Sequence, residues 1–320
     1  MMFPVIGFSL FPASEKPQFM VNIITPLQSN LKHTDSVARD VEKILGAHSE
    51  VQYFTTNVGK GNPQIYYNVM QENVRSDFAQ IFVQLEPNTT PDRKLEVIDE
   101  LRTELVSYEG AKIEVKNFEQ GPPVVAPVEV RLKGPNLDSL RVLAAKVEAT
   151  IEKVPGSLYV NNPISNLKTD IKVDIDYEKA NSLGVPTIYI DRMVRLAVAG
   201  FTLGNFSDPN GKDFDIVLTS DRGERATLEI FRSLYINNNQ GAAIPLSQIA
   251  SLKFESSPVT INHHNKARSV SISSFVEQGY LADDVINAVV KEMDQMKMSE
   301  GYSYEMGGEV ESRKESFDGF

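Results

Sequence analysis

The alternation of hydrophobic and polar residues repeats one pattern four times along the 320-residue chain. Each copy has an alternating segment typical of a half-buried strand, then a polar turn, an amphipathic helix and a second strand. In the first copy the strand covers 18–24, and the helix carries Val37, Val41 and Leu45. Their spacing places these three side chains on one helix face. The first copy is predicted to close with a strand at 51–54.

The other three copies follow the same order of elements. They predict strand pairs at 79–85 and 111–116, at 127–132 and 157–160, and at 269–275 and 302–306. The helix of the second copy starts at Thr90, whose hydroxyl can cap it, and Pro91 occupies the first helical position. Its predicted buried stripe consists of Leu95, Ile98, Leu101 and Leu105.

The repeat predicts an α+β fold with two ferredoxin-like β-α-β-β-α-β subdomains, because one β-α-β unit buries only one helix face. Copies one and two are nearly contiguous, whereas about a hundred residues separate copies three and four. The second subdomain is therefore split by an inserted mixed α/β subdomain. In the insert we expect strands at 169–176 and 213–219, helices at 177–183 and 188–199, and a loop or hairpin tip at 201–212.

Composition narrows the possible functions. The net charge of −11 argues against nucleic acid as a partner, because phosphate binding rests on Lys and Arg. The absence of cysteine excludes disulfides, thiolate metal sites and cysteine nucleophiles. No apolar run of about 18 residues is present, so no segment is predicted to span a bilayer. The apolar stretch 3–12, with its two prolines, lacks the basic start and cleavage site of a signal peptide.

The polar residues form no convincing catalytic or metal-binding set. His263 and His264 are adjacent in a predicted strand and point to opposite faces, and His33 and His48 flank a helix, so all four are interpreted as structural. The segment 208–213 lacks the acidic spacing of a calcium loop and is interpreted as a turn. We therefore predict no catalytic residue, no metal site and no cofactor, and a role in binding, gating or assembly.

The proline-rich stretch 121–135 joins the two repeated subdomains. It is interpreted either as a rigid spacer or as one wall of a cleft between the two ferredoxin-like units, where small-molecule sites often lie.

Five segments in the same order resemble the resistance–nodulation–cell division (RND) efflux transporters of the acriflavine-resistance branch. They are 11–19, the linker 121–135, 173–185, 244–250 and 307–317. The resemblance covers essentially the whole chain. It implies the first large periplasmic loop of a proton-driven pump of the bacterial inner membrane, with 1–12 the remnant of a membrane-helix exit.

The resemblance also implies a division into domains and a set of partners. The first porter subdomain is 13–120, the second is 121–164 with 262–310, the docking subdomain is 165–261, and 311–320 approaches the second membrane helix. Expected partners are the pump's own membrane domain and second periplasmic loop, two further copies in a homotrimer, a periplasmic adaptor, an outer-membrane channel and small amphiphilic substrates. The isolated fragment is expected to be monomeric.

Three sets of residues correspond to functional positions of the family. The substrate pathway corresponds to Ala126, Val128, Val130, Asn161, Pro258 and Val259. The central pore helix corresponds to Asp92, Leu95, Asp99, Arg102 and Val106. The arm that reaches a neighbouring protomer corresponds to Phe201, Leu203, Phe206, Asn210 and Lys212.

Export of drugs or amphiphiles is favoured over export of metals, because no cluster of methionines of the kind used by the heavy-metal branch is present. The alternative is a structural assembly module of a heavy-metal or other RND-type exporter whose specificity resides elsewhere. An enzyme built on ferredoxin-like domains is disfavoured because no nucleophile or metal set is visible.

Overall fold

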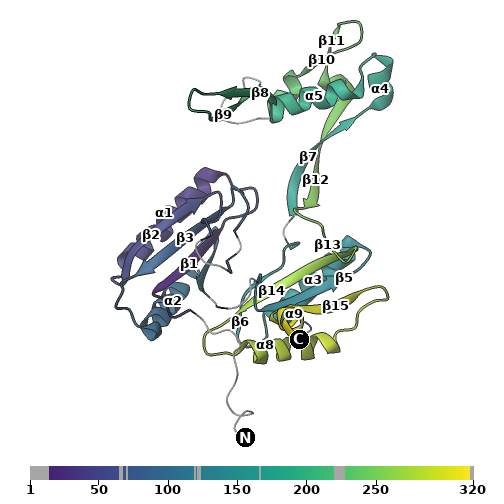
Figure 1. The fold of residues 1–320 in the computed structure, drawn as a ribbon. Coiled ribbons are helices and arrows are strands. Elements are labelled where there is room, and N and C mark those ends of the chain that lie inside the picture. The colour runs from purple at the N-terminus through teal and green to yellow at the C-terminus, as the bar shows by residue number, and fades with distance from the viewer. Residues whose placement is uncertain are drawn as a thin grey trace. The chain divides into compact units, whose positions relative to one another are not determined.

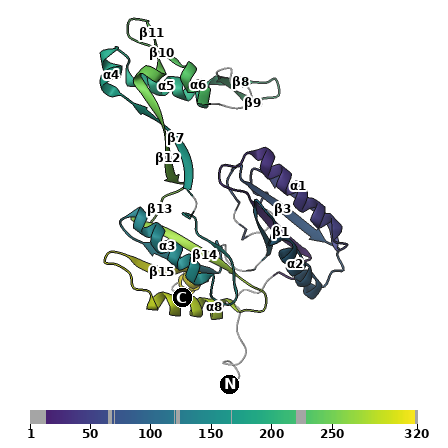
Figure 2. The ribbon, with the colours of Figure 1, turned by 180° about the vertical axis from the view of Figure 1, so that it is seen from behind.

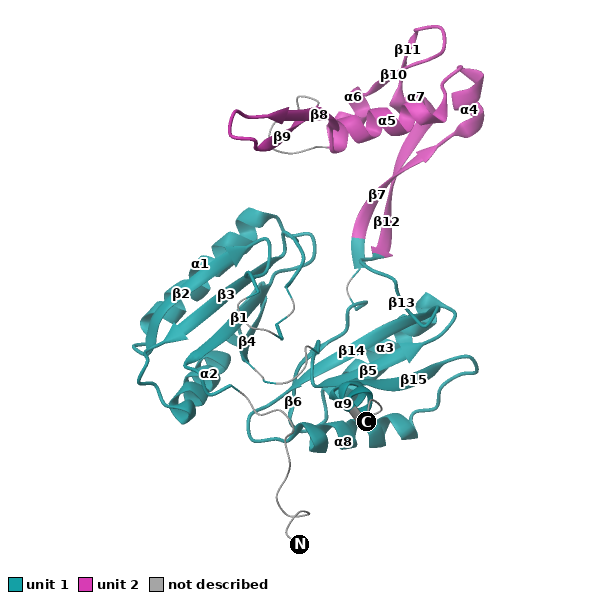
Figure 3. Ribbon diagram, viewed as in Figure 1, with its two compact units in different colours: residues 1–168, 258–320 teal, residues 169–257 magenta. Residues whose placement is uncertain are grey.

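The computed structural model describes residues 14–317 except 65–67, 70, 119, 121–123, 166 and 220–227. The stretch 3–12 and the prolines at 122 and 123 therefore lie outside the described residues. The chain divides into two compact units, one made of 1–168 and 258–320 and the other of 169–257 (Figure 3). In the described residues, no helix is both long and apolar enough to cross a membrane.

The first subdomain of the larger unit is a four-stranded antiparallel sheet with two helices (Figure 1). Its strands are β1 (Gln18–Ile24), β2 (Val51–Val58), β3 (Phe78–Leu85) and β4 (Lys112–Asn117). The strand order is β2-β3-β1-β4, and the helices α1 (Leu31–Ala47) and α2 (Pro91–Leu105) connect the strands within each half. This is the ferredoxin-like arrangement that the sequence predicts.

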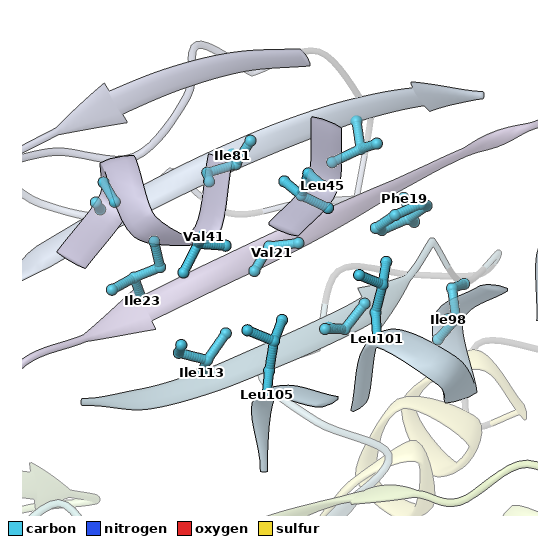
Figure 4. Close-up of a cluster of buried hydrophobic side chains, with 14 of the residues drawn as sticks. Phe19, Val21, Ile23, Val41, Leu45, Ile81, Ile98, Leu101, Leu105 and Ile113 are labelled. Carbon is cyan, nitrogen blue, oxygen red and sulfur yellow. The ribbon is translucent and has the colours of Figure 1, made fainter. Parts of the chain in front are cut away.

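The core of the first subdomain lies between the sheet and its two helices (Figure 4). Alternate residues of β1, namely Phe19, Val21 and Ile23, are fully buried against both helices. Val41 of α1 and Leu101 of α2 fill the opposite side of this core. Each such side chain contributes about 1.5–3 kcal/mol when it is removed from water.

Polar caps fix where both helices begin. The Asn30 side chain accepts a hydrogen bond from the backbone N–H of His33, and the Thr90 hydroxyl accepts one from that of Arg93. Each cap satisfies one of the N–H groups that a helix start leaves without a partner. The capped start predicted at Thr90 is confirmed.

The second subdomain repeats the arrangement with strands from distant parts of the chain. The strands are β5 (Val128–Lys133), β6 (Ser157–Asn161), β14 (Ala267–Val276) and β15 (Ser303–Gly308). Their order is β15-β5-β14-β6, and the short β13 (Asn262–His264) pairs with the start of β14. The helices are α3 (Leu137–Ile151) and α8 (Ala282–Gln295), and α9 (Glu309–Phe317) follows β15.

The smaller unit contains both helices and strands (Figure 2). It has its own core. Two long strands, β7 (Leu167–Ile175) and β12 (Ala250–Pro258), pair with each other. The other elements are α4 (Tyr177–Ser182), α5 (Thr187–Val198), β8 (Phe201–Ser207), β9 (Asp213–Leu218), α6 (Leu228–Ser233), β10 (Tyr235–Asn237), β11 (Ala243–Pro245) and α7 (Leu246–Ile249). Its small core contains Ile190, Ile236 and Ile249.

Two details of the predicted pattern are wrong. The buried stripe of α2 contains Lys94 and Val97 in addition to Ile98, Leu101 and Leu105, whereas Leu95 is only half-buried. The predicted loop or hairpin tip at 201–212 is shorter than expected, because strand β8 of the hairpin already covers Phe201–Ser207. Its polar turn is stabilised by the Asp208 carboxylate, which accepts hydrogen bonds from the backbone N–H groups of Asn210 and Lys212.

Candidate functional site

The outer strand β4 carries a strip of alternating charges on the sheet face that the helices leave uncovered. Ile113 and Val115 point into the core, so Lys112, Glu114 and Lys116 point to the other face. Only 4% of Glu114 is exposed, and its carboxylate lies 3.0 Å from the Lys112 ammonium and 2.7 Å from that of Lys116. Burial alone would raise the pKa of Glu114, but the two ammonium groups outweigh this effect and the pKa lies below its ordinary value.

Both lysines of this strip also contact the second subdomain. The Lys112 ammonium donates a hydrogen bond of 3.1 Å to the carbonyl oxygen of Val160 in β6. The Lys116 ammonium lies 4.1 Å from the centroid of the Phe275 ring in β14. This distance is within the range of a cation–π interaction. The buried Glu114 carboxylate therefore links two cations that each contact the second subdomain.

Tyr159 of β6 closes the free edge of β4. Its hydroxyl accepts a hydrogen bond of 2.9 Å from the backbone N–H of Val115, while Arg102 of α2 donates through Nε to the Val115 carbonyl oxygen at 3.0 Å. The Arg102 guanidinium also lies 5.9 Å from the centroid of the Tyr159 ring. Tyr159 has a φ of +53°, a conformation that an aromatic residue rarely adopts. Strained residues of this kind are often found where a structure serves a function.

Two pockets lie beside this contact, and together we call them the subdomain cleft. One encloses about 160 Å³ and the other about 230 Å³. Both have Lys116, Asn117, Phe275 and Glu309 in their walls. The smaller pocket is also lined by Met20, Asn22, Glu72, Gln80, Phe118 and Val124. The larger pocket is also lined by Leu95, Arg102, Leu158, Tyr159 and Tyr280.

Hydrogen bonds between buried amides fix one wall of the smaller pocket. The Gln80 side chain donates to the Asn22 side-chain oxygen at 2.9 Å, and its own oxygen accepts from the backbone N–H of Asn62 at 2.8 Å. Asn22 and Gln80 are neighbours in register on β1 and β3. Because their side chains are tied to each other, this wall presents a defined polar surface.

Glu309, at the start of α9, is the carboxylate that both pockets share. Burial raises the pKa of Glu309, Arg313 partly offsets this effect, and Asp283 adds to it. The nearest Arg313 nitrogen is 3.9 Å away, and the same nitrogen lies 2.5 Å from Asp283. Among the described residues, the cation nearest to the Glu309 carboxylate is therefore Arg313, which Asp283 shares.

The six residues predicted for the substrate pathway do not lie together in the structure. Ala126, Val128 and Val130 are buried at 0–1% exposure, and the two valines contribute to the core beneath α3 and α8. Asn161 is exposed at the end of β6, and Pro258 is half-buried at the end of β12. Val259, which follows Pro258, is 48% exposed. None of the six is among the residues that line the cleft, and their contact with substrate stays a prediction.

The five residues predicted for the pore helix lie on α2 or at its end. Leu95 and Arg102 line the larger pocket of the cleft, and Arg102 also pairs with Asp99 at 3.0 Å. Asp92 lies in the first helical turn, and Val106, which ends the helix, is 82% exposed.

The five residues predicted for the inter-protomer arm all belong to the β8–β9 hairpin. Phe201, Leu203 and Phe206 lie on β8, where Leu203 is 66% and Phe206 is 59% exposed. Asn210 and Lys212 lie in its turn. Apolar side chains this exposed are typical of a surface that meets another surface. The arm's contact with a neighbouring protomer stays a prediction.

Most residues of the cleft were not predicted from the sequence, among them Lys116, Tyr159, Phe275 and Glu309. One signal was available, because Lys112, Glu114 and Lys116 alternate within the predicted strand 111–116. Charged residues at every second position of a strand indicate a polar face. Their partners could not be read from the chain, since Phe275 lies far along the sequence from β4.

Residues 1–319 match the model of the AcrB/AcrD/AcrF family. The chain belongs to this family. The resemblance to RND efflux transporters is thereby confirmed, and the relatives of the chain are transporters.

Relatives of this AcrB/AcrD/AcrF family member are named for different substrates. The cobalt-zinc-cadmium resistance protein CzcA of Cupriavidus metallidurans is 26% identical over 270 residues, which cover 78% of this chain and 25% of that protein. The multidrug resistance protein MdtC of Proteus mirabilis is 22% identical over 221 residues, which cover 68% of this chain and 21% of that protein. The relatives therefore include both metal and multidrug resistance proteins.

A crystal structure of a heavy metal efflux pump has the same fold. It superposes with a TM-score of 0.82 at 15% identity, and the match covers 99% of this chain and 33% of that one. The chain spans about a fifth to a third of the length of the curated relatives and solved structures that it matches. In the described residues, no group of three or more histidines and carboxylates could hold a metal ion.

Proposed function

We propose that this chain is the periplasmic porter and docking region of a proton-driven RND exporter of the bacterial inner membrane. In this role the chain binds substrates and passes them on without changing them chemically. Small amphiphilic compounds are the proposed substrates, and the subdomain cleft forms part of their path. The proposed partners are the exporter's membrane domain and second periplasmic loop, two further copies in a trimer, an adaptor and an outer-membrane channel.

One observation carries the proposal: the subdomain cleft lies between two ferredoxin-like sheets in a chain of this transporter family. The contact beside the cleft consists of charged and aromatic pairs rather than a continuous apolar core. Lys112, Lys116 and Tyr159 make its named interactions. Polar interfaces within a chain usually permit relative motion of the parts that they join. The cleft is therefore suited to open and close as the two subdomains move as rigid bodies.

The proposal can be tested by locking the cleft in the full-length transporter. Because this region has no cysteine, Lys112→Cys and Val160→Cys introduce a unique thiol pair here, at a position where the two subdomains touch. The doubly substituted transporter is treated with a short bis-maleimide in cells that lack other exporters, and efflux of an amphiphilic dye is measured. Cross-linking should abolish efflux, while either single-cysteine variant, treated identically, should export at the untreated rate.

The alternative function is an assembly module of a metal or other exporter whose specificity lies outside this chain. The kinship with CzcA and the fold shared with a heavy metal efflux pump favour this candidate. Full export of dye and of Co²⁺ or Zn²⁺ by the cross-linked transporter would reject the cleft as a substrate path. Cross-linking between protomers through Leu203→Cys, on the β8–β9 hairpin, would then support the assembly role.

A further inference from the structure

Strand β6 contains a β-bulge whose first residue is Tyr159. The pairing of β6 with β14 shifts register at this point, and Tyr159 and Val160 together lie opposite the single residue Ser274. The fully buried Ser274 hydroxyl stabilises the bulge, because it accepts a hydrogen bond of 3.2 Å from the backbone N–H of Leu158. A bulge bends its strand and changes the direction in which a side chain points.

The backbone at this bulge has a conformation that favours glycine. Tyr159 has a φ of +53°, and bulges whose first residue has a positive φ usually carry glycine there. An aromatic residue in this conformation is strained, and such strain persists only where the surrounding structure compensates for it. The described hydrogen bond and cation–π contact of the Tyr159 side chain are both with the first subdomain. The compensation therefore depends on the contact between the two subdomains.

Val115 is the residue of β4 that the Tyr159 hydroxyl reaches. Strand β4 lies at the end of the strand order, and the N–H of Val115 points to its free edge, where Tyr159 accepts the hydrogen bond at 2.9 Å. The Val115 carbonyl oxygen points to the same edge and accepts from Arg102. When the two subdomains separate, the Val115 N–H therefore loses its acceptor to water.

Tyr159 is also a wall of the larger pocket of the subdomain cleft, together with Leu158 and Phe275. Withdrawal of Tyr159 from β4 therefore widens this pocket as it frees the edge of the strand. Backbone strain of this kind and the net contribution of one hydrogen bond are similar in free energy. The strain thus offsets much of what the hydrogen bond contributes, and the contact is released easily.

We propose that Tyr159 is a strained latch, a positioning residue that keeps the two subdomains together at β4 and is released when the subdomain cleft opens. The inference rests on the proposed opening of the cleft and adds to it the residue that regulates this opening. The bulge directs the side chain toward Val115 while the cleft is closed. The backbone of Tyr159 relaxes once the side chain is free, which favours the open cleft.

The latch is tested by measuring the distance between the two subdomains in the 320-residue chain. Because the chain has no cysteine, Val106→Cys at the end of α2 and Val142→Cys on α3 introduce two unique sites for nitroxide labels, and both positions are exposed. Double electron–electron resonance then gives the populations of closed and separated subdomains. Tyr159→Phe, which removes the hydroxyl, should raise the ratio of separated to closed chains by about 2- to 13-fold, the factor equivalent to one net hydrogen bond.

Ser274→Ala tests whether the bulge acts through Tyr159. It removes the hydroxyl that stabilises the bulge and should also raise the proportion of separated chains. In a chain that already carries Tyr159→Phe it should have no further effect, because both changes act on the same contact. Tyr304→Phe, whose hydroxyl bonds within the second subdomain, and Ser271→Ala, on β14 outside the bulge, are the matched controls and should leave the distances unchanged.

The distances distinguish a latch from a residue that only supports the fold. A purely structural role would lower the midpoint of urea unfolding and leave the distance distribution of the folded chain unchanged. An unchanged distribution in Tyr159→Phe would overturn the inference, and so would a wild-type chain whose subdomains are already fully separated. Additive effects of Tyr159→Phe and Ser274→Ala would overturn the role of the bulge.

Failure of the latch and failure of the proposed function give different results. Cross-linking that abolishes dye efflux, together with unchanged distances in Tyr159→Phe, would leave the substrate path in place without the latch. Changed distances in Tyr159→Phe, together with full efflux after cross-linking, would leave the latch as a property of the fold and reject the path.

Discussion

The buried ammonium of Lys94 leads to a quantitative prediction about stability and pH. Lys94 lies on the sheet side of α2 and is 1% exposed. Its ammonium donates hydrogen bonds to the carbonyl oxygens of Ser14 and Lys16 and, at 3.0 Å, to the side-chain oxygen of Asn117. Among the described residues no carboxylate is hydrogen-bonded to this ammonium, and the more distant charge of Glu15 favours its protonated form.

Burial in this neutral site lowers the pKa of Lys94 from its ordinary value of 10.5 to about 8, although Glu15 opposes the change. Between pH 8 and 10.5 the unfolded chain therefore binds more protons at this residue than the folded chain does. Under this condition the free energy of unfolding rises with pH. The difference between the pKa of Lys94 in the unfolded chain and in the folded chain is equivalent to about 3 kcal/mol. Lys94 should thus stabilise the fold less at pH 7 than at pH 10.

The prediction is measured by urea unfolding of the wild-type chain and of Lys94→Met from pH 6 to pH 10. The difference between the two free energies isolates Lys94, because the other titrating groups are common to both chains. This difference should be constant below pH 7, where Lys94 is protonated in both states. It should then move in favour of the wild type by about 2–3 kcal/mol up to pH 10. A difference that stays flat or moves the other way would refute the buried-ammonium reasoning.

Three further predictions concern the core and the contact between the subdomains. Leu101→Ala should lower the free energy of unfolding by about 2–5 kcal/mol in urea titrations, because Leu101 is fully buried in the first core; a loss below 1 kcal/mol would contradict this packing. Tyr159→Phe should lower stability by about 1–3 kcal/mol and accelerate hydrogen exchange of the Val115 amide, which loses its acceptor; unchanged exchange would reject the contact. The ionised Glu114 carboxylate stabilises the wild type above pH 4.5, and this stabilisation is lost as pH falls through the lowered pKa of Glu114. Glu114→Gln should remove it. Acid-unfolding curves of wild type and variant that run parallel would show that the two lysines do not stabilise this carboxylate.

The period-2 and helical patterns were sufficient to predict both ferredoxin-like sheets. Residues such as Val115 and Val130 alternate with polar neighbours because each strand has one face against helices and the other outside the core. Strand order then followed from the rule that two β-α-β halves share one sheet. Lys94 of α2 is buried although the helical pattern predicts only apolar residues in the buried stripe. A lysine is expected to be exposed unless its hydrogen-bond acceptors are known. Those acceptors, at 14, 16 and 117, come from segments that only the folded chain brings together.

The cleft was less predictable, for a related reason. The sequence suggested that the linker 121–135 forms one wall of a cleft, and the family resemblance implied that Val128 and Val130 belong to the substrate pathway. Strand alternation turns both of these side chains into the second core. Interactions such as Lys116 with Phe275 join residues that are far apart in the chain, and no local pattern specifies them.

The contact between the two subdomains differs in chemistry from the core of each subdomain. Each sheet is held to its helices by fully buried aliphatic side chains, whose separation would expose a large apolar area. The contact around β4 relies instead on Lys112, Lys116 and Tyr159, whose partners water can replace. A hydrogen bond of this kind contributes about 0.5–1.5 kcal/mol net, and a partly exposed cation–π contact contributes about 0.5–1 kcal/mol. These three contacts together contribute less than the roughly 5–15 kcal/mol by which a domain is typically stable, so they would allow the motion that the proposed path requires.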